Sequence, residues 1–308
     1  MDTARTTFAS WMALPVGTLA AAGCCVALTM TAHARPAAPD AAPKHVTCTL
    51  IAEQIAATPG STITLGVDLT IEKKWHVYST SRNDNGFPPN AEWKLPAGFT
   101  VDALQWPAPV RHVDPGDLLN HVYFDHVTLP VTLHVPTSAQ PGSTAVIKAT
   151  VKWLVCDTTC VGEDADVEFK LTIAKPGETP AKSADAKKFD EARLRLPREF
   201  VAGSKDVTIE WPTPKSVTIT VPGASHIEFF PDDACFPFVS PIKDPVADGA
   251  KLSIALDTPE PEQTALVGVL EVRRADKPTV WYRLTQTPPG SPTKPTASQP
   301  FTPPKTSP

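Results

Sequence analysis

Two cysteines, Cys156 and Cys160, stand with three residues between them at the end of an alternating apolar segment. The alternation predicts a strand that ends at this pair and presents it at the rim of a domain. A disulfide across so short a loop stabilises a fold by only about 2 kcal/mol, against about 4.7 kcal/mol for a 100-residue loop. Reversible thiol–disulfide exchange therefore explains the presence of this pair better than a stabilising crosslink does. A static local disulfide and two separate thiols stay open, because the spacing alone does not distinguish them.

Two further cysteines, Cys48 and Cys235, lie in different halves of the chain. They permit a disulfide that joins the halves, and they equally permit two unpaired, buried thiols. We expect a structural role for both, whichever form they take.

The amino-terminal segment has the features of an export signal. No charged residue occurs between Arg5 and Arg35, and Ala32-His33-Ala34 provides a cleavage site of the A-x-A type. We expect residues 1–34 to be a signal peptide that is cleaved after Ala34, with an uncleaved membrane anchor or a lipoprotein site at Cys24 as alternatives. Export places the remaining cysteines in a compartment where disulfides form.

The segments that must position the cysteine pair read as strands. Apolar residues recur at every second position in four segments of the first half, namely 63–71, 127–135, 147–155 and 167–173. This period is typical of half-buried strands, and it predicts an all-β, immunoglobulin-like β-sandwich over residues 45–175.

A second, smaller β module is expected over residues 201–286, where six more strand patterns occur. Residues 176–200 read as a linker with one short helix, which Ser183 caps and which ends before Pro197. Proline-rich flanks complete the organisation, with a tether at 35–44 and a disordered tail at 287–308.

Composition excludes several classes of function. The net charge of −5 and the pI near 5.9 disfavour a nucleic-acid-binding surface. The 35 prolines against 15 glycines disfavour a helical bundle, because proline breaks helices. No glycine-rich phosphate loop, HExxH motif or Ser/His/Asp order is present, so neither a cofactor nor a hydrolase is predicted.

Histidines and aromatic residues gather in the half that carries the cysteine pair. A soft-metal site that uses Cys156 and Cys160 is conceivable, but no His/Cys spacing typical of a metal site occurs, and we predict no metal. The aromatic residues are expected to fill the core rather than to form a docking surface. The two groups are His76, His112, His121, His126 and His134, and Trp75, Tyr78, Trp93, Trp106 and Trp153.

Several short segments together resemble the DsbD amino-terminal domain family. They are Trp75-His-Val-Tyr78, Trp93-Lys-Leu-Pro-Ala-Gly-Phe99, Gln105-Trp-Pro-Ala-Pro109, Thr128-Leu-Pro-Val131 and Trp153-Leu-Val-Cys156-Asp-Thr-Thr-Cys160. The resemblance covers about residues 45–175. In the second half, Phe229-Phe-Pro231 and Leu266-Val-Gly-Val-Leu270 resemble the second β module of ScsB-type proteins.

The resemblance implies a periplasmic thiol:disulfide interchange domain whose catalytic pair is Cys156 and Cys160. Such a domain passes reducing equivalents from a membrane donor to thioredoxin-fold partners. Both are expected here to be separate proteins, because full members continue into a transmembrane carrier and a thioredoxin-like domain that we do not find. The alternatives are a non-catalytic β-sandwich binding or scaffold module with a static disulfide, and a copper- or zinc-handling protein.

The resemblance also implies a cap loop over the cysteines, at about residues 113–123. Asp114 falls where the family has an acidic cap residue. Pro115 and Gly116 replace acidic and aromatic cap residues, so Leu118, Leu119 or Tyr123 is expected to take over the shielding.

Overall fold

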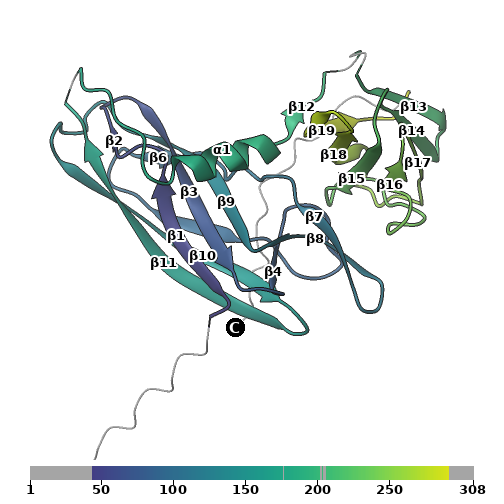
Figure 1. Ribbon diagram of the computed structural model, residues 1–308, viewed down its shortest axis with the longest axis horizontal. Coiled ribbons are helices and arrows are strands. Elements are labelled where there is room, and N and C mark those ends of the chain that lie inside the picture. Colours follow the sequence, from purple (N-terminus) through teal and green to yellow (C-terminus); the bar gives the residue numbers. More distant parts are fainter. Residues whose placement is uncertain (1–43, 176, 202, 204–205, 291–308) are drawn as a thin grey trace, which may run out of the picture. The chain divides into compact units, whose positions relative to one another are not determined.

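The computed structural model describes residues 44–290 except 176, 202, 204 and 205. The predicted signal peptide, almost all of the tether, and the tail from residue 291 lie outside this part, and those predictions stay untested. The described residues form four β-sheets and one helix (Figure 1). The predicted all-β fold is therefore confirmed.

The first two sheets pack face to face around one hydrophobic core. The first has the order β1 (Val46–Ala52), β3 (Thr62–Ile71), β9 (His126–His134) and β6 (Thr100–Val101). The second has the order β2 (Ala56–Ala57), β11 (Cys160–Ile173), β10 (Thr144–Cys156), β4 (His76–Tyr78), β8 (Leu118–Phe124) and β7 (Val110–Asp114), with β5 (Asn90–Lys94) also paired to β10. Leu65 and Leu129 from the first sheet meet Val151 and Trp153 from the second in the core.

The other two sheets enclose a separate core. The third sheet has the order β12 (Arg198–Glu199), β19 (Lys277–Gln286), β18 (Leu266–Arg274), β15 (His226–Pro231) and β16 (Val246–Asp248). The fourth has the order β13 (Thr208–Thr213), β14 (Ser216–Thr220) and β17 (Lys251–Ala255). Ile219 and Ile254 pack there with Phe229 and Leu270.

The long hairpin β10–β11 carries the cysteine pair. Its strands pair in an unbroken register from Thr144↔Thr172 to Cys156↔Cys160 (Figure 1). The alternation seen in the sequence explains this length: Val151 and Trp153 are buried on one face, while Lys148 on the other face pairs with Glu168 at 3.4 Å. The β10–β11 pairing thus places Cys156 and Cys160 at the end of the hairpin.

The single described helix, α1 (Ala186–Arg195), lies against the first sheet (Figure 1). Its N-cap is Asp185, so the prediction that Ser183 caps the helix is wrong. The Ser183 hydroxyl instead donates a hydrogen bond to the carbonyl oxygen of Ala52 at 2.5 Å, which fastens the start of the helix to β1.

A buried carboxylate on β3 also holds the helix. Asp68 accepts hydrogen bonds from Thr128 at 2.6 Å, His126 at 2.7 Å and Lys188 of α1 at 2.8 Å. Burial alone would raise the pKa of Asp68, but these hydrogen bonds outweigh burial and lower the pKa to about 2.

Replacing Asp68 by asparagine is therefore expected to destabilise the protein in a pH-dependent way. The folded-state pKa lies below the value of the unfolded chain, so the ionised group stabilises the fold above about pH 4 and ceases to do so as the pH falls towards 2. Urea unfolding at pH 7 should show a loss of about 1–2 kcal/mol after allowance for solvent screening. The loss should shrink at pH 3.

A matched control is Asp102→Asn, which removes the charge of an exposed carboxylate that lies 2.9 Å from His134. This variant should unfold like the parent at both pH values. A loss for Asp68→Asn that is the same at both would contradict the charge-based account.

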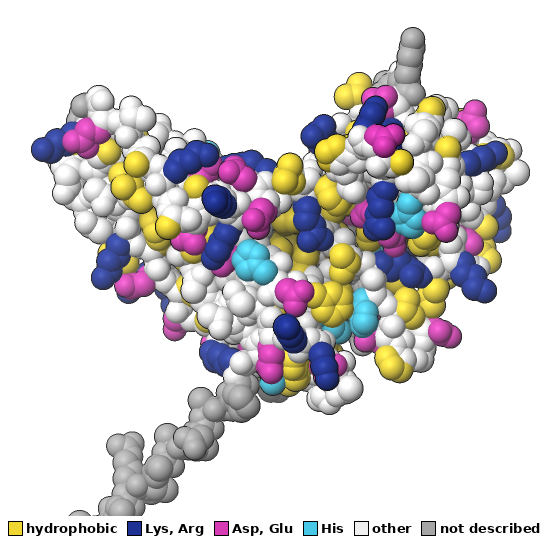
Figure 2. All heavy atoms as spheres, viewed as in Figure 1, with side chains coloured by type: hydrophobic (Ala, Val, Ile, Leu, Met, Phe, Trp, Pro, Cys, Tyr) yellow, Lys and Arg dark blue, Asp and Glu magenta, His cyan; other side chains and the backbone are white. Residues whose placement is uncertain are grey.

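Surface charges are mixed in sign. On the face shown in Figure 2, Lys and Arg side chains are interspersed with Asp and Glu side chains. That face therefore presents no extended field of one sign.

Candidate functional site

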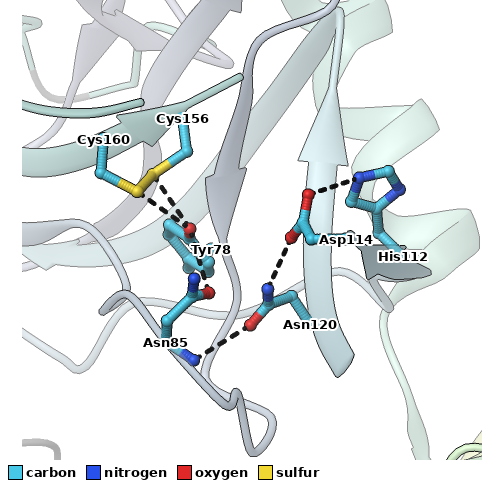
Figure 3. A network of polar contacts seen from close by, with 7 residues as sticks. All are labelled: Tyr78, Asn85, His112, Asp114, Asn120, Cys156 and Cys160. Atoms are coloured by element: carbon cyan, nitrogen blue, oxygen red, sulfur yellow. Dashed lines mark hydrogen bonds and ion pairs between the residues drawn. A yellow bond between two sulfur atoms is a disulfide. The ribbon is translucent and has the colours of Figure 1, made fainter. Parts of the chain in front are cut away.

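Cys156 and Cys160 form a disulfide at the hairpin end, with their Cα atoms 4.2 Å apart (Figure 3). The two sulfur positions differ in access, because Cys160 is exposed whereas Cys156 is only 2% exposed. A partner protein can reach Cys160, and Cys156 is positioned to attack Cys160 from inside.

A tyrosine hydroxyl faces the disulfide. Tyr78 on β4 donates a hydrogen bond to Cys156 Sγ at 3.0 Å, and its oxygen lies 3.6 Å from Cys160 Sγ and 3.4 Å from Asn85 Oδ1 (Figure 3). Burial, and secondly the charge of Asp114, raise the pKa of Tyr78 to about 12. The hydroxyl therefore keeps its proton at neutral pH and can donate it in a hydrogen bond to a thiolate.

A chain of polar contacts leads from this tyrosine to Asp114. The backbone N–H of Asn85 donates to Asn120 Oδ1 at 3.3 Å, and Asn120 Nδ2 donates to Asp114 Oδ2 at 2.8 Å. Asp114 Oδ1 lies 3.1 Å from His112 Nε2 (Figure 3). We call these five residues the Tyr78–His112 network. Asp114 is thus connected to the disulfide through other residues and not by direct contact.

The segment predicted as a cap loop forms the hairpin of β7 and β8. Of its expected shielding residues, Tyr123 lies on the face opposite to the disulfide network, whereas Leu118 lies on the same face as Asn120. Tyr123 belongs to the main core, on the same face as Val77, and donates its hydroxyl hydrogen bond to Pro107 at 2.5 Å. Leu118 pairs with Asp114 at the hairpin end and is 37% exposed.

A different segment covers Tyr78, namely residues 79–89 between β4 and β5, here called the 79–89 loop. At Gly86 the backbone lies so close that an added Cβ would be 2.2–2.5 Å from ring atoms of Tyr78. The positive φ of 79° at Gly86 is also one that glycine adopts readily. The loop thus covers Tyr78 in addition to the predicted cap segment, whose Val122 packs with Tyr78 and Cys156.

Hydrogen bonds of residues 82–84 fix the 79–89 loop on two sides. On the β8 side, Asn83 Oδ1 accepts from the N–H of His121 at 2.7 Å, and Asp84 Oδ2 accepts from the N–H of Leu119 at 2.6 Å. Arg82 donates from its backbone N–H to Pro231 at 2.7 Å, and from its guanidinium to carbonyls at 233 and 235. The loop is therefore held in a defined position next to Tyr78.

The other two cysteines of the described residues, Cys48 and Cys235, are free thiols. Burial raises the pKa of Cys48 on β1 to about 12, and the nearby charge of Asp68 adds to this effect. Burial likewise raises the pKa of Cys235, which is fully buried in the second core, to about 12. Neither thiol ionises near neutral pH, so neither competes with Cys156 and Cys160 in exchange.

The roles of Tyr78, Asn85 and Asn120 were not predicted from the sequence, from which Tyr78 was expected only to fill the core. The available signal was the alternation in His76-Val-Tyr78, which puts His76 and Tyr78 on one face and Val77 on the other. Which strand lies beside this face could not be derived from that signal.

Among the described residues, no group of three or more His, Cys, Asp or Glu side chains is arranged to hold a metal ion. No helix in the described part is long and apolar enough to cross a membrane.

Comparison with known proteins now assigns the first β-sandwich. The family model for the amino-terminal domain of the thiol:disulfide interchange protein DsbD matches residues 49–172. Residues 49–172 belong to the DsbD amino-terminal domain family. The match includes Cys156, Cys160 and every residue of the Tyr78–His112 network.

Solved structures extend the likeness in fold beyond the DsbD-type domain. The N-terminal periplasmic domain of ScsB from Proteus mirabilis superposes with a TM-score of 0.51 at 14% identity, covering 79% of this chain and 92% of that chain. The sixth cohesin of scaffoldin B from Acetivibrio cellulolyticus gives a TM-score of only 0.22 at 13% identity, covering 42% of this chain and 99% of that chain, and carries no argument. A search of curated proteins returned no match.

Proposed function

We propose that this protein is a periplasmic thiol:disulfide interchange protein that works through the Cys156–Cys160 pair. The family to which residues 49–172 belong is one of interchange domains. The observation that carries the proposal is the disulfide itself, which joins the exposed residue Cys160 to the buried residue Cys156, with a tyrosine hydroxyl bonded to the sulfur of Cys156. A merely structural staple needs no such asymmetry.

The exchange runs in two steps from the reduced protein. The Cys160 thiolate attacks a partner disulfide, which forms a mixed disulfide and releases one partner thiolate. The Cys156 thiolate then attacks Cys160 Sγ, so that the Cys156–Cys160 bond forms and the second partner thiolate leaves. The partner gains two electrons and this protein loses two. Tyr78 stabilises the Cys156 thiolate by its hydrogen bond.

The partners follow from the family. We propose thioredoxin-fold periplasmic proteins as acceptors and a separate membrane protein as the electron donor. Residues 45–175 act as the interchange domain, residues 176–200 as the linker and residues 201–286 as a separate β module. Export rests on the signal peptide predicted to end at Ala34.

A redox titration tests the proposal. The purified protein is equilibrated with graded dithiol/disulfide buffers, free thiols are alkylated, and the modified cysteines are mapped by peptide mass. Interchange requires Cys156 and Cys160 to titrate as one two-electron couple at roughly −120 to −270 mV. A pair that stays oxidised below about −300 mV would instead identify a static disulfide and a scaffold module.

A further inference from the structure

Cys156 lies in the middle of a cross-strand row. β10 places it opposite Cys160 of β11 on one side and opposite His76 of β4 on the other. Directly opposite residues of antiparallel strands project their side chains from the same face of the sheet, with Cβ atoms about 4.5–5.5 Å apart. The register thus places an imidazole beside the buried sulfur, on the side away from Cys160.

The His76 imidazole is buried without a hydrogen-bond partner. His76 is 1% exposed, and neither ring nitrogen is hydrogen-bonded within the described part of the chain. Its ring packs instead against other rings, with centroids 5.3 Å from Tyr78, 5.2 Å from His112 and 5.5 Å from Phe124. An unpaired buried polar group destabilises a fold, so an apolar residue would be more stable at this position. The retention of an unpaired, buried imidazole at this position indicates that His76 has a role in another state of the protein, the reduced one.

We propose that His76 accepts the proton of the Cys156 thiol when the pair is reduced. The reduced protein then holds a thiolate at Cys156 and an imidazolium at His76. The S–H bond of Cys156 breaks in the reduced protein and its proton goes to a ring nitrogen of His76, and this ion pair persists in the mixed disulfide. There the sulfur of Cys156 attacks Cys160 Sγ, and the bond from Cys160 to the partner breaks. The leaving partner thiolate takes up one proton from solvent, and the imidazolium, which no longer has a thiolate beside it, releases its proton to solvent. This step deepens the proposed function and rests on it.

The charges around His76 suit this role. Burial lowers the pKa of His76 below its ordinary value, so the ring is neutral at pH 7 and free to accept a proton. Asp114 of β7 and Asp157 of the hairpin turn favour the imidazolium, whereas His112 opposes it. A thiolate at Cys156 adds one more negative charge in the same row, which favours the imidazolium further. Tyr78 on the same strand stays neutral and donates to Cys156.

The thiol of Cys156 can be titrated alone in a Cys160→Ser variant, by the ultraviolet absorbance of the thiolate. Cys48 and Cys235, whose pKa values burial raises to about 12, stay silent below pH 10. Adding His76→Phe is expected to lower the thiolate fraction at pH 7 at least about tenfold, as the loss of a nearby opposite charge requires. The matched control adds His134→Phe instead, a histidine bonded to Asp102 on the exposed surface, and should leave the titration unchanged.

A second measurement needs no substitution at His76. NMR titration of its ring protons in the oxidised and in the reduced protein should show a higher pKa in the reduced form, because the thiolate favours the imidazolium. Equal His76 titrations in the two forms, or equal thiolate fractions with and without His76→Phe, would overturn the assignment. Circular dichroism checks that the variants fold, and His76→Gln replaces the phenylalanine variant if that one does not.

The outcome is separable from the proposed function. Both titrations read an equilibrium within this protein and involve no partner. The redox titration above reports whether the pair exchanges at all. If the pair exchanges normally while Cys156 titrates independently of His76, only the role of His76 as proton acceptor is contradicted. If the pair does not exchange, the proposed function itself is contradicted.

Discussion

Serine in place of Cys160 is expected to stop thiol–disulfide exchange, whereas serine in place of Cys156 should leave a protein that attacks a partner once and stays bound to it. The reason is access: Cys160 is exposed and Cys156 is 2% exposed. Attack requires a thiolate that the partner can reach. Only Cys160 meets that condition, and only Cys156 is placed to resolve the mixed disulfide.

Reaction of the reduced variants with a chromogenic aromatic disulfide measures both steps. The parent protein should release two equivalents of coloured thiolate, the first in a step that depends on reagent concentration and the second in one that does not. Cys156→Ser should release one equivalent and retain the mixed disulfide, visible by mass. Cys160→Ser should react at least about a hundredfold more slowly, because the remaining thiol is buried.

The double variant Cys156→Ser/Cys160→Ser is the background control, since it keeps Cys48 and Cys235. Equal initial rates for the two single variants would show that access does not select the attacking sulfur. The order of the two steps proposed here would then be wrong.

Local pattern made the cysteine pair predictable. The alternation that ends in Trp153 and Val155 specifies a strand with one buried face, and it places Cys156 and Cys160 where that strand ends. These features depend on residues close in sequence. The same holds for most strands and for the existence of the helix, although not for its cap.

The surroundings of the pair depend on pairings that local pattern does not determine. β4 has only three residues, and its register with β10 joins His76 to a cysteine far along the chain. Tyr123 does not shield the disulfide as expected, because a shift of one position in a strand moves a side chain to the opposite face. Tyr123 falls on the core face with Val77, while Asn120 and Asp114 fall on the face of the disulfide network.

Gly86 provides the sharpest test of the 79–89 loop as the cover of the site. Alanine there should destabilise the protein by about 3 kcal/mol, from backbone strain at positive φ and from overpacking. The added Cβ would lie 2.2–2.5 Å from ring atoms of Tyr78, so the ring must move. Because Tyr78 donates to Cys156 Sγ, this movement should also slow the second, resolving step of exchange.

Gly142→Ala is the matched control, since Gly142 has nearly the same φ, 82° against 79°, and no atom within 4 Å of an added Cβ. It isolates the backbone strain, about 1–2 kcal/mol. Tyr78→Phe isolates the hydroxyl, and should slow the resolving step about tenfold, since a hydrogen bond to a thiolate contributes roughly 1.5–3 kcal/mol. Urea unfolding and the two-phase colour release measure these effects. Equal unfolding free energies for Gly86→Ala and Gly142→Ala would show that the loop does not press on Tyr78, and that the disulfide face is open on this side.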